Sequence, residues 1–262
     1  MLKKIKKIIF FFLQFFVKKK ISTTFQNGIE FKVETRDKLG ESWNLINEYD
    51  LSEFQVFTKL NKNDVKIVHY YGCHQSMIPI KIHKIFLPDS KFYCFEAIDR
   101  NYQIGLNNIK LNNCENKMQI FNEAISDKNG YEYFDFFSLN SFRTKKKLLS
   151  KKIKSSRLEN IFERYGRPDL IYFDIEGLEG VVIEDSIKIL KAWKNYLFIE
   201  SHGDETMKNY GFTNILLYKL LKKHNYSLYK LNQNYKSDNE KFIKIENENE
   251  IPTNRYYLLA VN

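Results

Sequence analysis

Short apolar stretches alternate with longer amphipathic stretches along most of the chain, beginning at Lys66. The short stretches are typical of β-strands and the longer ones of α-helices. Strands are predicted at 66–72, 92–96, 118–125, 131–137, 170–175, 196–200, 227–231 and 256–261. Helices are predicted at 75–87, 101–112, 158–165, 180–193 and 215–224. This order predicts a Rossmann-like, doubly wound α/β fold: a mostly parallel sheet, helices on both faces and an antiparallel last strand.

The first residues follow a different pattern, in which lysines flank an apolar run from Ile8 to Val17. A membrane-spanning helix needs about 20 apolar residues, so this run is too short to cross a bilayer. Lysines follow it where a cleaved signal peptide has small residues. Residues 1–20 therefore fit a segment that lies on an anionic membrane surface, and the alternative is a helix packed on the protein's own core.

Residues 21–62 are mixed in pattern, with short helices predicted at 41–46 and 51–60. We therefore divide the chain into the segment 1–20, an N-terminal helical extension at 21–62 and a Rossmann-like domain at 63–262. With 262 residues, of which 43% are hydrophobic, the chain can form one sizeable core.

The net charge of +10 permits an anionic membrane, an acidic substrate or nucleic acid as a partner. A lysine cluster between Lys145 and Lys154 is interpreted as a solvated loop or helix face, and no motif indicates specific nucleic-acid recognition. Three widely spaced cysteines argue against a disulfide scaffold and for a reducing compartment. We expect a cytoplasmic protein, peripheral at the inner face of the membrane if residues 1–20 bind there.

The segment from Tyr70 to Ser76 forms the first strand-to-helix turn. Gly72 lets the backbone approach a nucleotide-like ligand, and the helix that follows supplies free N–H groups. This signal is weak without further glycines, because a turn of this shape needs a glycine in any case. Glu96 ends the second strand, where Rossmann-like folds place an acid that binds ribose hydroxyls; a structural ion pair is the alternative.

The motif Asp174-Ile-Glu176-Gly-Leu-Glu179 places three carboxylates after the 170–175 strand. Neighbouring carboxylates raise one another's pKa, which suits acid–base chemistry. We interpret Asp174 and Glu176 as functional and Glu179 as a residue that stabilises the helix N-terminus. His202 ends the next strand and could accept a proton from a substrate hydroxyl, although a single histidine is more often structural.

Taken together, these motifs resemble the FkbM family of S-adenosylmethionine-dependent methyltransferases from about Lys66 to about Leu231. The matches are Gly72-Cys-His-Gln75, Phe95-Glu96-Ala97, the Asn-rich stretch 107–113, Glu123-Ala-Ile-Ser-Asp-Lys-Asn-Gly130, Asp174-Ile-Glu-Gly-x-Glu179 and Glu200-Ser-His202. The Asp-Ile-Glu-Gly-x-Glu match is the most specific of these. Two positions depart from the family, which usually has an acid at Tyr70 and often has a glycine at Ser76.

The resemblance implies S-adenosylmethionine as cofactor and O-methylation of a sugar or polyketide-like hydroxyl, with a cell-surface glycan as a natural acceptor. It assigns the cofactor turn to Tyr70, Gly72, Cys73 and His74, the ribose to Glu96 and the adenine neighbourhood to Asp127. Asp174, Glu176 and His202 then act as base or orient the substrate. A divalent metal between Asp174, Glu176 and Glu200 or His202 is conceivable from the ligand types but is not favoured.

Three other readings remain open. The departures at Tyr70 and Ser76 motivate a catalytically degenerate scaffold or binding module in glycan assembly. A glycosyltransferase is disfavoured because no Asp-x-Asp motif is present. Nucleic-acid methylation is permitted by charge alone. Acceptor specificity is expected in the N-terminal region, in 136–156 and in 233–252, which are the least patterned segments.

Overall fold

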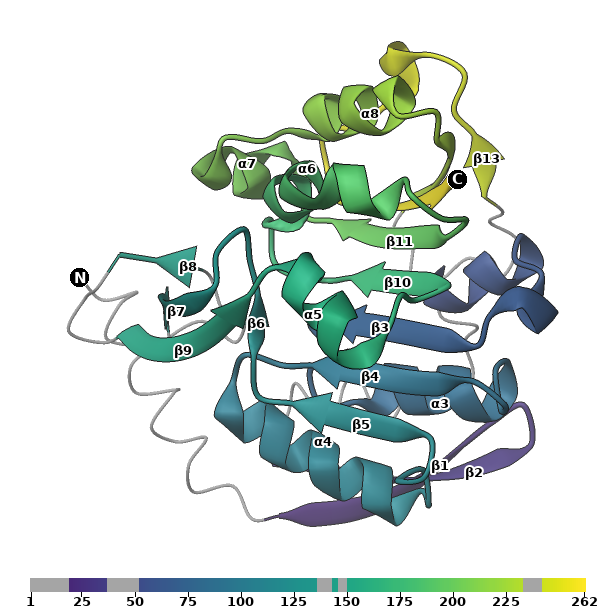
Figure 1. Ribbon diagram of the computed structural model, residues 1–262. Helices are drawn as coiled ribbons and strands as arrows, with labels where there is room; N and C mark the ends of the chain where they lie inside the picture. The colour runs from purple at the N-terminus through teal and green to yellow at the C-terminus, as the bar shows by residue number, and fades with distance from the viewer. Residues whose placement is uncertain (1–18, 37–51, 136–142, 146–149, 233–241) are drawn as a thin grey trace.

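The centre of the protein is an eight-stranded sheet (Figure 1). The computed structural model describes residues 19–36, 52–135, 143–145, 150–232 and 242–262. Within them the strand order is β13-β12-β14-β11-β10-β3-β4-β5. The strands are β3 (Ile67–Tyr71), β4 (Lys91–Phe95), β5 (Met118–Phe121), β10 (Leu170–Phe173), β11 (Tyr196–Ser201), β12 (Ser227–Asn232), β13 (Ile243–Lys244) and β14 (Tyr256–Val261).

The strands β3, β4, β5, β10 and β11 are mutually parallel, and β14 runs antiparallel to both β11 and β12. The mostly parallel sheet and the antiparallel last strand are therefore confirmed. Strand order reverses beside β3, which has β4 on one side and β10 on the other. In such sheets ligands bind beyond the carboxyl ends of the strands at this reversal.

Helices cover both faces of the sheet. They are α3 (Met77–Ile85), α4 (Asp99–Leu111), α5 (Leu158–Tyr165), α6 (Glu179–Leu190), α7 (Gly203–Met207) and α8 (Asn214–Lys223). Five of these six match the predicted helices within a few residues, and α7 was not predicted. Short 3-10 helices occur at Ser52–Thr58, Lys62–Asp64, Lys208–Tyr210 and Glu248–Glu250.

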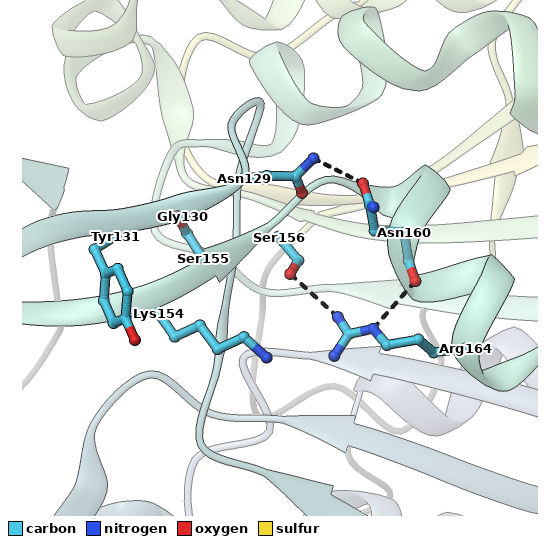
Figure 2. Close-up of a pocket in the computed structure, with 8 residues that line it drawn as sticks. All are labelled: Asn129, Gly130, Tyr131, Lys154, Ser155, Ser156, Asn160 and Arg164. Carbon is cyan, nitrogen blue, oxygen red and sulfur yellow. Dashed lines mark hydrogen bonds between the residues drawn. The ribbon is translucent and has the colours of Figure 1, made fainter.

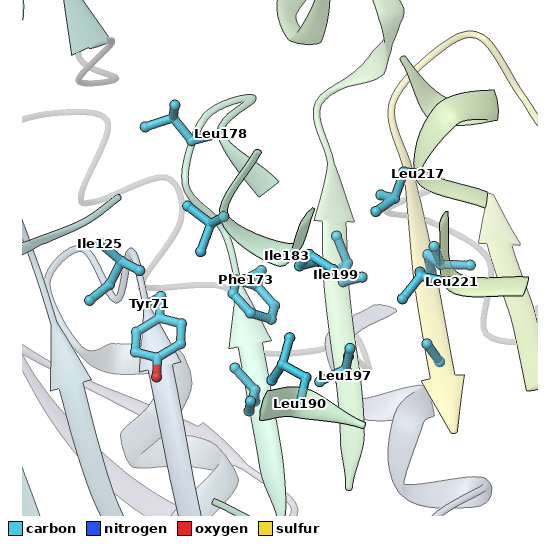
Figure 3. Close-up of a cluster of buried hydrophobic side chains, with 14 of the residues drawn as sticks. Tyr71, Ile125, Phe173, Leu178, Ile183, Leu190, Leu197, Ile199, Leu217 and Leu221 are labelled. Atoms are coloured by element: carbon cyan, nitrogen blue, oxygen red, sulfur yellow. The ribbon is translucent and has the colours of Figure 1, made fainter. Parts of the chain in front are cut away.

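Two hydrophobic clusters, one on each face, explain the continuous apolar runs in the strands. Ile171 and Phe173 of β10 pack with α5, α6 and α8 (Figure 3), whereas Leu170 and Tyr172 pack on the opposite face with α3. Alternate residues of a strand point to opposite faces, so a sheet covered on both sides needs apolar residues at every position.

A second, four-stranded sheet lies beyond the carboxyl ends of the central strands (Figure 1). Its order is β6-β9-β7-β8, with β6 (Ala124–Ile125), β7 (Gly130–Asp135), β8 (Arg143–Thr144) and β9 (Ser150–Ser156). The predicted strand 118–125 is thus two strands in two sheets, separated at Asn122 and Glu123.

The lysine cluster is also different from the prediction where the structure describes it. Lys151, Lys152 and Lys154 belong to β9 and are exposed, while Ile153 and Ser155 are buried. A strand with alternating exposure keeps these lysines in solvent as well as a loop or helix does, and the period-two pattern of 152–155 is too short to identify from the sequence.

The predicted helical extension at 21–62 is wrong at its start. β1 (Lys20–Gln26) and β2 (Ile29–Thr35) form an antiparallel hairpin, and Phe31 and Val33 are buried against the α3 face. Asn27 and Gly28, both with positive φ, make the two-residue turn. Asn-Gly between two apolar-alternating runs is a strong hairpin signal, so the sequence did contain this element.

The predicted helix at 41–46 lies outside the described residues. That at 51–60 corresponds to the 3-10 helix Ser52–Thr58. Within the described part of the chain, no helix combines the length and apolar character that crossing a membrane requires.

Candidate active site

The turn after β3 is held against the end of β10 so closely that only glycine fits. Gly72 has φ +82°, and a Cβ at this position would lie 1.7 Å from the carbonyl oxygen of Asp174. The N–H groups of Gly72 and Cys73 both donate to Phe95 O of β4, at 2.9 and 3.1 Å. The predicted glycine turn therefore connects three strand ends, and it lies beside the acidic motif.

Two residues predicted to form the cofactor turn, Tyr70 and Cys73, have side chains that point into the protein core. The ring of Tyr70 is buried and stacks on Tyr172, with centroids 4.7 Å apart. The thiol of Cys73 is buried in the same cluster and accepts a long contact from Ser76 Oγ at 3.7 Å. Tyr70 and Cys73 are thus core side chains, because their places in and after β3 direct them towards the α3 face.

The departure at Ser76 has a backbone explanation. Ser76 is fully buried with φ +62°, a left-handed conformation in which glycine carries no steric cost. The close approach of Gly105 in α4 makes room for the hydroxyl, since a Cβ on Gly105 would lie 2.7 Å from Ser76 Oγ. The turn therefore keeps its shape with serine in the glycine position.

Glu96 lies directly after β4 and is 5% exposed. Its carboxylate accepts N–H bonds from His74 and Ile98, each at 2.8 Å, and a side-chain bond from Asn101. Burial raises the pKa of Glu96 to about 7, although these bonds lower it. A carboxylate has about four lone-pair sites, so about one remains at this strand end for a ribose hydroxyl to donate to.

The sequence placed Asp127 directly after the third strand, and the structure corrects that position, whereas its place near the adenine stays a prediction. β5 ends at Phe121, and Asp127 lies beyond β6 in the second sheet, where it forms an ion pair with Arg143. Burial alone would raise the pKa of Asp127, and the Arg143 guanidinium lowers it below the usual range. Asn122 instead follows β5 and donates to the carbonyls of Glu96 and Ala97, at 2.9 and 3.1 Å.

The acidic motif after β10 and the end of β11 meet around His202. His202 Nε2 lies 3.4 Å from Asp174 Oδ1 and 3.3 Å from Glu176 Oε2, while Nδ1 lies 2.7 Å from Glu179 Oε1. The three residues predicted to be catalytic are therefore brought together. Glu176 has φ +55°, a strained conformation of the kind that collects at functional sites.

Glu179 has a larger role than stabilising the helix N-terminus. It is fully buried as the first residue of α6, and its Oε1 accepts the N–H groups of Ile175 and Gly177, at 3.2 and 3.1 Å. The same oxygen bonds His202. Glu179 thus holds the whole motif in its turn and orients the imidazole.

The carboxylates around His202 favour the charged form of its imidazole. Burial alone would lower the pKa of His202, but Glu179 beside Nδ1, together with Asp174 and Glu176, raises it to about 10. A charged imidazole has no lone pair with which to accept a proton. In its charged form His202 positions the carboxylates and leaves the role of base to one of them, whereas the neutral ring can itself accept a proton at Nε2.

Burial raises the pKa of Asp174 well above its usual value, and Glu200 adds to the effect. Burial likewise raises the pKa of Glu176, against the lowering effect of His202. Asp174 is the more exposed of the two, at 30% against 18% for Glu176. It is thus the carboxylate better placed to reach a substrate.

Arg255, which the sequence did not indicate, completes the cluster. It precedes β14 and forms an ion pair with the buried Glu200, and its Nη2 lies 3.1 Å from His202 Nε2. Because a guanidinium only donates hydrogen bonds, Nε2 accepts in this contact, which favours the uncharged ring. No local motif marks this arginine as functional, because only the antiparallel pairing of β11 with β14 brings residues 200 and 255 together.

Ligand atoms of Asp174, Glu200 and His202 lie within 4.8 Å of one another, close enough to hold a metal ion. However, Arg255 already neutralises Glu200, and His202 would have to lose its proton to coordinate a cation. The residues present fit a guanidinium better than a metal at this position, so we route no chemistry through a metal.

The fold and the site together define a Rossmann-like protein with a glycine turn, a strand-end acid and a carboxylate cluster at one sheet edge. The sequence profile of the FkbM methyltransferase domain matches residues 80–228. The chain therefore belongs to the FkbM family of S-adenosylmethionine-dependent methyltransferases, which confirms the resemblance and the prediction of an enzyme.

Several solved structures are similar to this chain at low sequence identity. Methyltransferase FkbM from Methylobacillus flagellatus KT is 13% identical with a TM-score of 0.48, covering 75% of this chain and 44% of that one. The putative transferase PH0793 from Pyrococcus horikoshii is 13% identical with a TM-score of 0.49, covering 93% and 72%. Precorrin-6y C5,15-methyltransferase from Geobacter metallireducens GS-15 is 10% identical with a TM-score of 0.46, covering 84% and 92%. No curated protein sequence matches the chain.

Proposed function

We propose that this enzyme transfers a methyl group from S-adenosylmethionine to a hydroxyl oxygen of a saccharide, as part of glycan modification. The observation that carries the proposal is the contact between Gly72 and the Asp174 carbonyl, which fixes the carboxylate cluster beside the cofactor turn. A methyl donor and a proton acceptor are needed at one place for O-methylation, and this edge supplies positions for both.

In this proposal S-adenosylmethionine lies between the glycine turn and Glu96. The backbone of Gly72 and His74 offers close approach, and Glu96 accepts ribose hydroxyls. When bound, S-adenosylmethionine supplies an electrophilic methyl group on a sulfonium. The carboxylates of Asp174, Glu176, Glu179 and Glu200 outnumber the two cations, His202 and Arg255, so the cluster carries a negative field that favours a cationic ligand.

In the proposed reaction Asp174 removes the proton of the substrate hydroxyl. Its raised pKa makes it a stronger base than an exposed aspartate. Glu176 and the His202 imidazolium hold Asp174 in place and orient the acceptor. The amide groups of Asn129 and Asn160 and the hydroxyl of Ser156, beside the second sheet, favour a sugar as the acceptor.

Binding of S-adenosylmethionine to the full chain tests the proposal. We expect micromolar affinity by calorimetry and a loss of about tenfold or more for Glu96→Ala, because a charged acceptor of hydrogen bonds is removed. Affinity of the wild type is expected to fall as pH drops below about 7, where Glu96 takes up a proton. Glu96→Gln is expected to remove this pH dependence.

Glu205→Gln is the matched control, since Glu205 is exposed on α7. If a well-folded wild-type protein binds no S-adenosylmethionine, the chain is instead a degenerate module, and the left-handed Ser76 would be the first place to look for the cause.

We also propose that residues 1–18 attach the enzyme peripherally to an anionic membrane at the cytoplasmic face. The lysines and phenylalanines of this segment support it. Deleting 1–18, which spares the 2.7 Å ion pair between Lys19 and the buried Glu34, is expected to abolish co-sedimentation with phosphatidylglycerol vesicles. Equal sedimentation of the shortened chain would rule the proposal out, and neutral phosphatidylcholine vesicles serve as the control.

A further inference from the structure

A pocket of about 350 Å³ lies between the second sheet and α5 (Figure 2). Its wall comes from the β7 turn, from the end of β9 and from one face of α5. Asn129, Tyr131, Lys154, Ser156, Asn160 and Arg164 carry the polar groups that matter for recognition. None of these residues takes part in the cluster around His202.

The pocket holds more positive than negative charge. Arg164 donates to both oxygens of Glu123, at 2.8 and 3.1 Å, and Lys154 Nζ lies 3.4 Å from the same carboxylate. Glu123 is 4% exposed, whereas the Lys154 side chain is 53% exposed and the Arg164 side chain 34%. The buried Glu123 carboxylate thus balances only one of the two cations, and Lys154 and Arg164 both remain accessible to solvent. An anionic ligand entering the pocket would therefore contact these two side chains.

The rest of the lining suits a sugar. The amide of Asn129 donates to Asn160 Oδ1 at 2.8 Å, leaving each side chain further donors and acceptors. Ser155 also lines the pocket, is 1% exposed and has no hydrogen-bond partner for its hydroxyl among the described residues. Tyr131 is 63% exposed, and Lys152 Nζ lies 4.7 Å from its ring. An exposed tyrosine offers an apolar ring face together with a polar tip.

The second sheet joins this pocket to the candidate active site. β7 contributes Tyr131 to the pocket and pairs with β8, whose Arg143 carbonyl accepts a 3.4 Å bond from Tyr210 OH. Tyr210 in turn lies against Gly177 of the acidic motif. A saccharide chain that reaches both the pocket and the acidic motif would therefore run along the second sheet.

We infer that this pocket binds an acidic sugar unit of the acceptor, one that carries a carboxylate or a phosphate. The inference rests on the proposed saccharide acceptor and specifies its charge. Lys154 and Arg164 take the anionic group, the Asn129–Asn160 pair takes hydroxyls, and Tyr131 covers the sugar ring.

Binding of three small probes to the full chain tests it: glucuronic acid, glucose 6-phosphate and uncharged glucose, each followed by ligand-observed NMR titration. We expect the acidic sugars to bind up to about fivefold more tightly than glucose, because an exposed charge pair contributes up to about 1 kcal/mol. Lys154→Ala is expected to remove that difference, and Tyr131→Ala to weaken all three probes. A preference for only one acidic sugar would identify the anion as carboxylate or phosphate.

Lys151→Ala is the matched control, because Lys151 is an exposed lysine of β9 that does not line the pocket. Equal affinity for glucose and the acidic sugars, or an unchanged preference in a folded Lys154→Ala protein, would overturn the inference. A melting temperature close to wild type establishes that Lys154→Ala is folded. These titrations need no S-adenosylmethionine, so failure of the pocket and failure of the methyltransferase proposal give separate results.

Discussion

Gly72→Ala is expected to destabilise the protein by about 2–5 kcal/mol and to abolish S-adenosylmethionine binding. The left-handed backbone of this residue costs an alanine about 1–2 kcal/mol, and overpacking adds about 1–3 kcal/mol. The overlap is with backbone, since the new Cβ would lie 1.7 Å from Asp174 O, so no rotamer change relieves it. Urea unfolding and calorimetry measure the two effects.

Gly211→Ala separates the two contributions. Gly211 has almost the same backbone, φ +80°, but nothing lies within 4 Å of a Cβ there. It should therefore show the conformational cost alone, about 1–2 kcal/mol, with cofactor binding intact. Equal unfolding free energies for the two variants would contradict the close approach of Gly72 to the Asp174 carbonyl at the end of β10.

Asp174→Asn is expected to lower kcat for methyl transfer by about 10²–10⁴-fold while leaving S-adenosylmethionine affinity within a few-fold of wild type. Amide and carboxylate have nearly the same shape, so the loss isolates proton acceptance. Because burial and Glu200 raise the pKa of Asp174, wild-type kcat is expected to increase with pH as this carboxyl loses its proton, and the variant lacks that rise. Release of S-adenosylhomocysteine with an acceptor found by screening acidic saccharides provides the measurement.

Asp89→Asn is the matched control, an exposed aspartate just before β4, at the opposite end of the sheet. A variant at Asp174 that kept its rate would exclude Asp174 as the base and direct attention to Glu176. A variant that lost cofactor affinity instead would assign Asp174 to the methyl donor's site.

The strands and helices of the central sheet were predicted from the pattern of apolar residues within each segment, and that pattern was sufficient for the fold class. Runs such as Leu170–Phe173 are apolar at every position because both faces of the sheet are covered, and that property is readable residue by residue. Where the alternating pattern was short or interrupted, as in β6 and β9, it did not predict separate strands. The hairpin of β1 and β2 was not predicted, although Asn27-Gly28 is a typical turn sequence, because the helix-like patterns at 41–46 and 51–60 dominate residues 21–62.

The sequence by itself also determined which residues would share the ligand edge. Gly72, Glu96, Asp174 and His202 each follow a strand, and parallel strands in one sheet bring their carboxyl ends to the same side. Tertiary structure alone decided what these groups do there. The charge of His202 depends on carboxylates that converge from separate turns, Arg255 arrives through an antiparallel pairing, and Asp127 is drawn to Arg143 in the second sheet. The position of each strand end can be read from the local sequence. The charge state of a side chain depends on its distances to groups elsewhere in the fold, and no single segment of the sequence contains those distances.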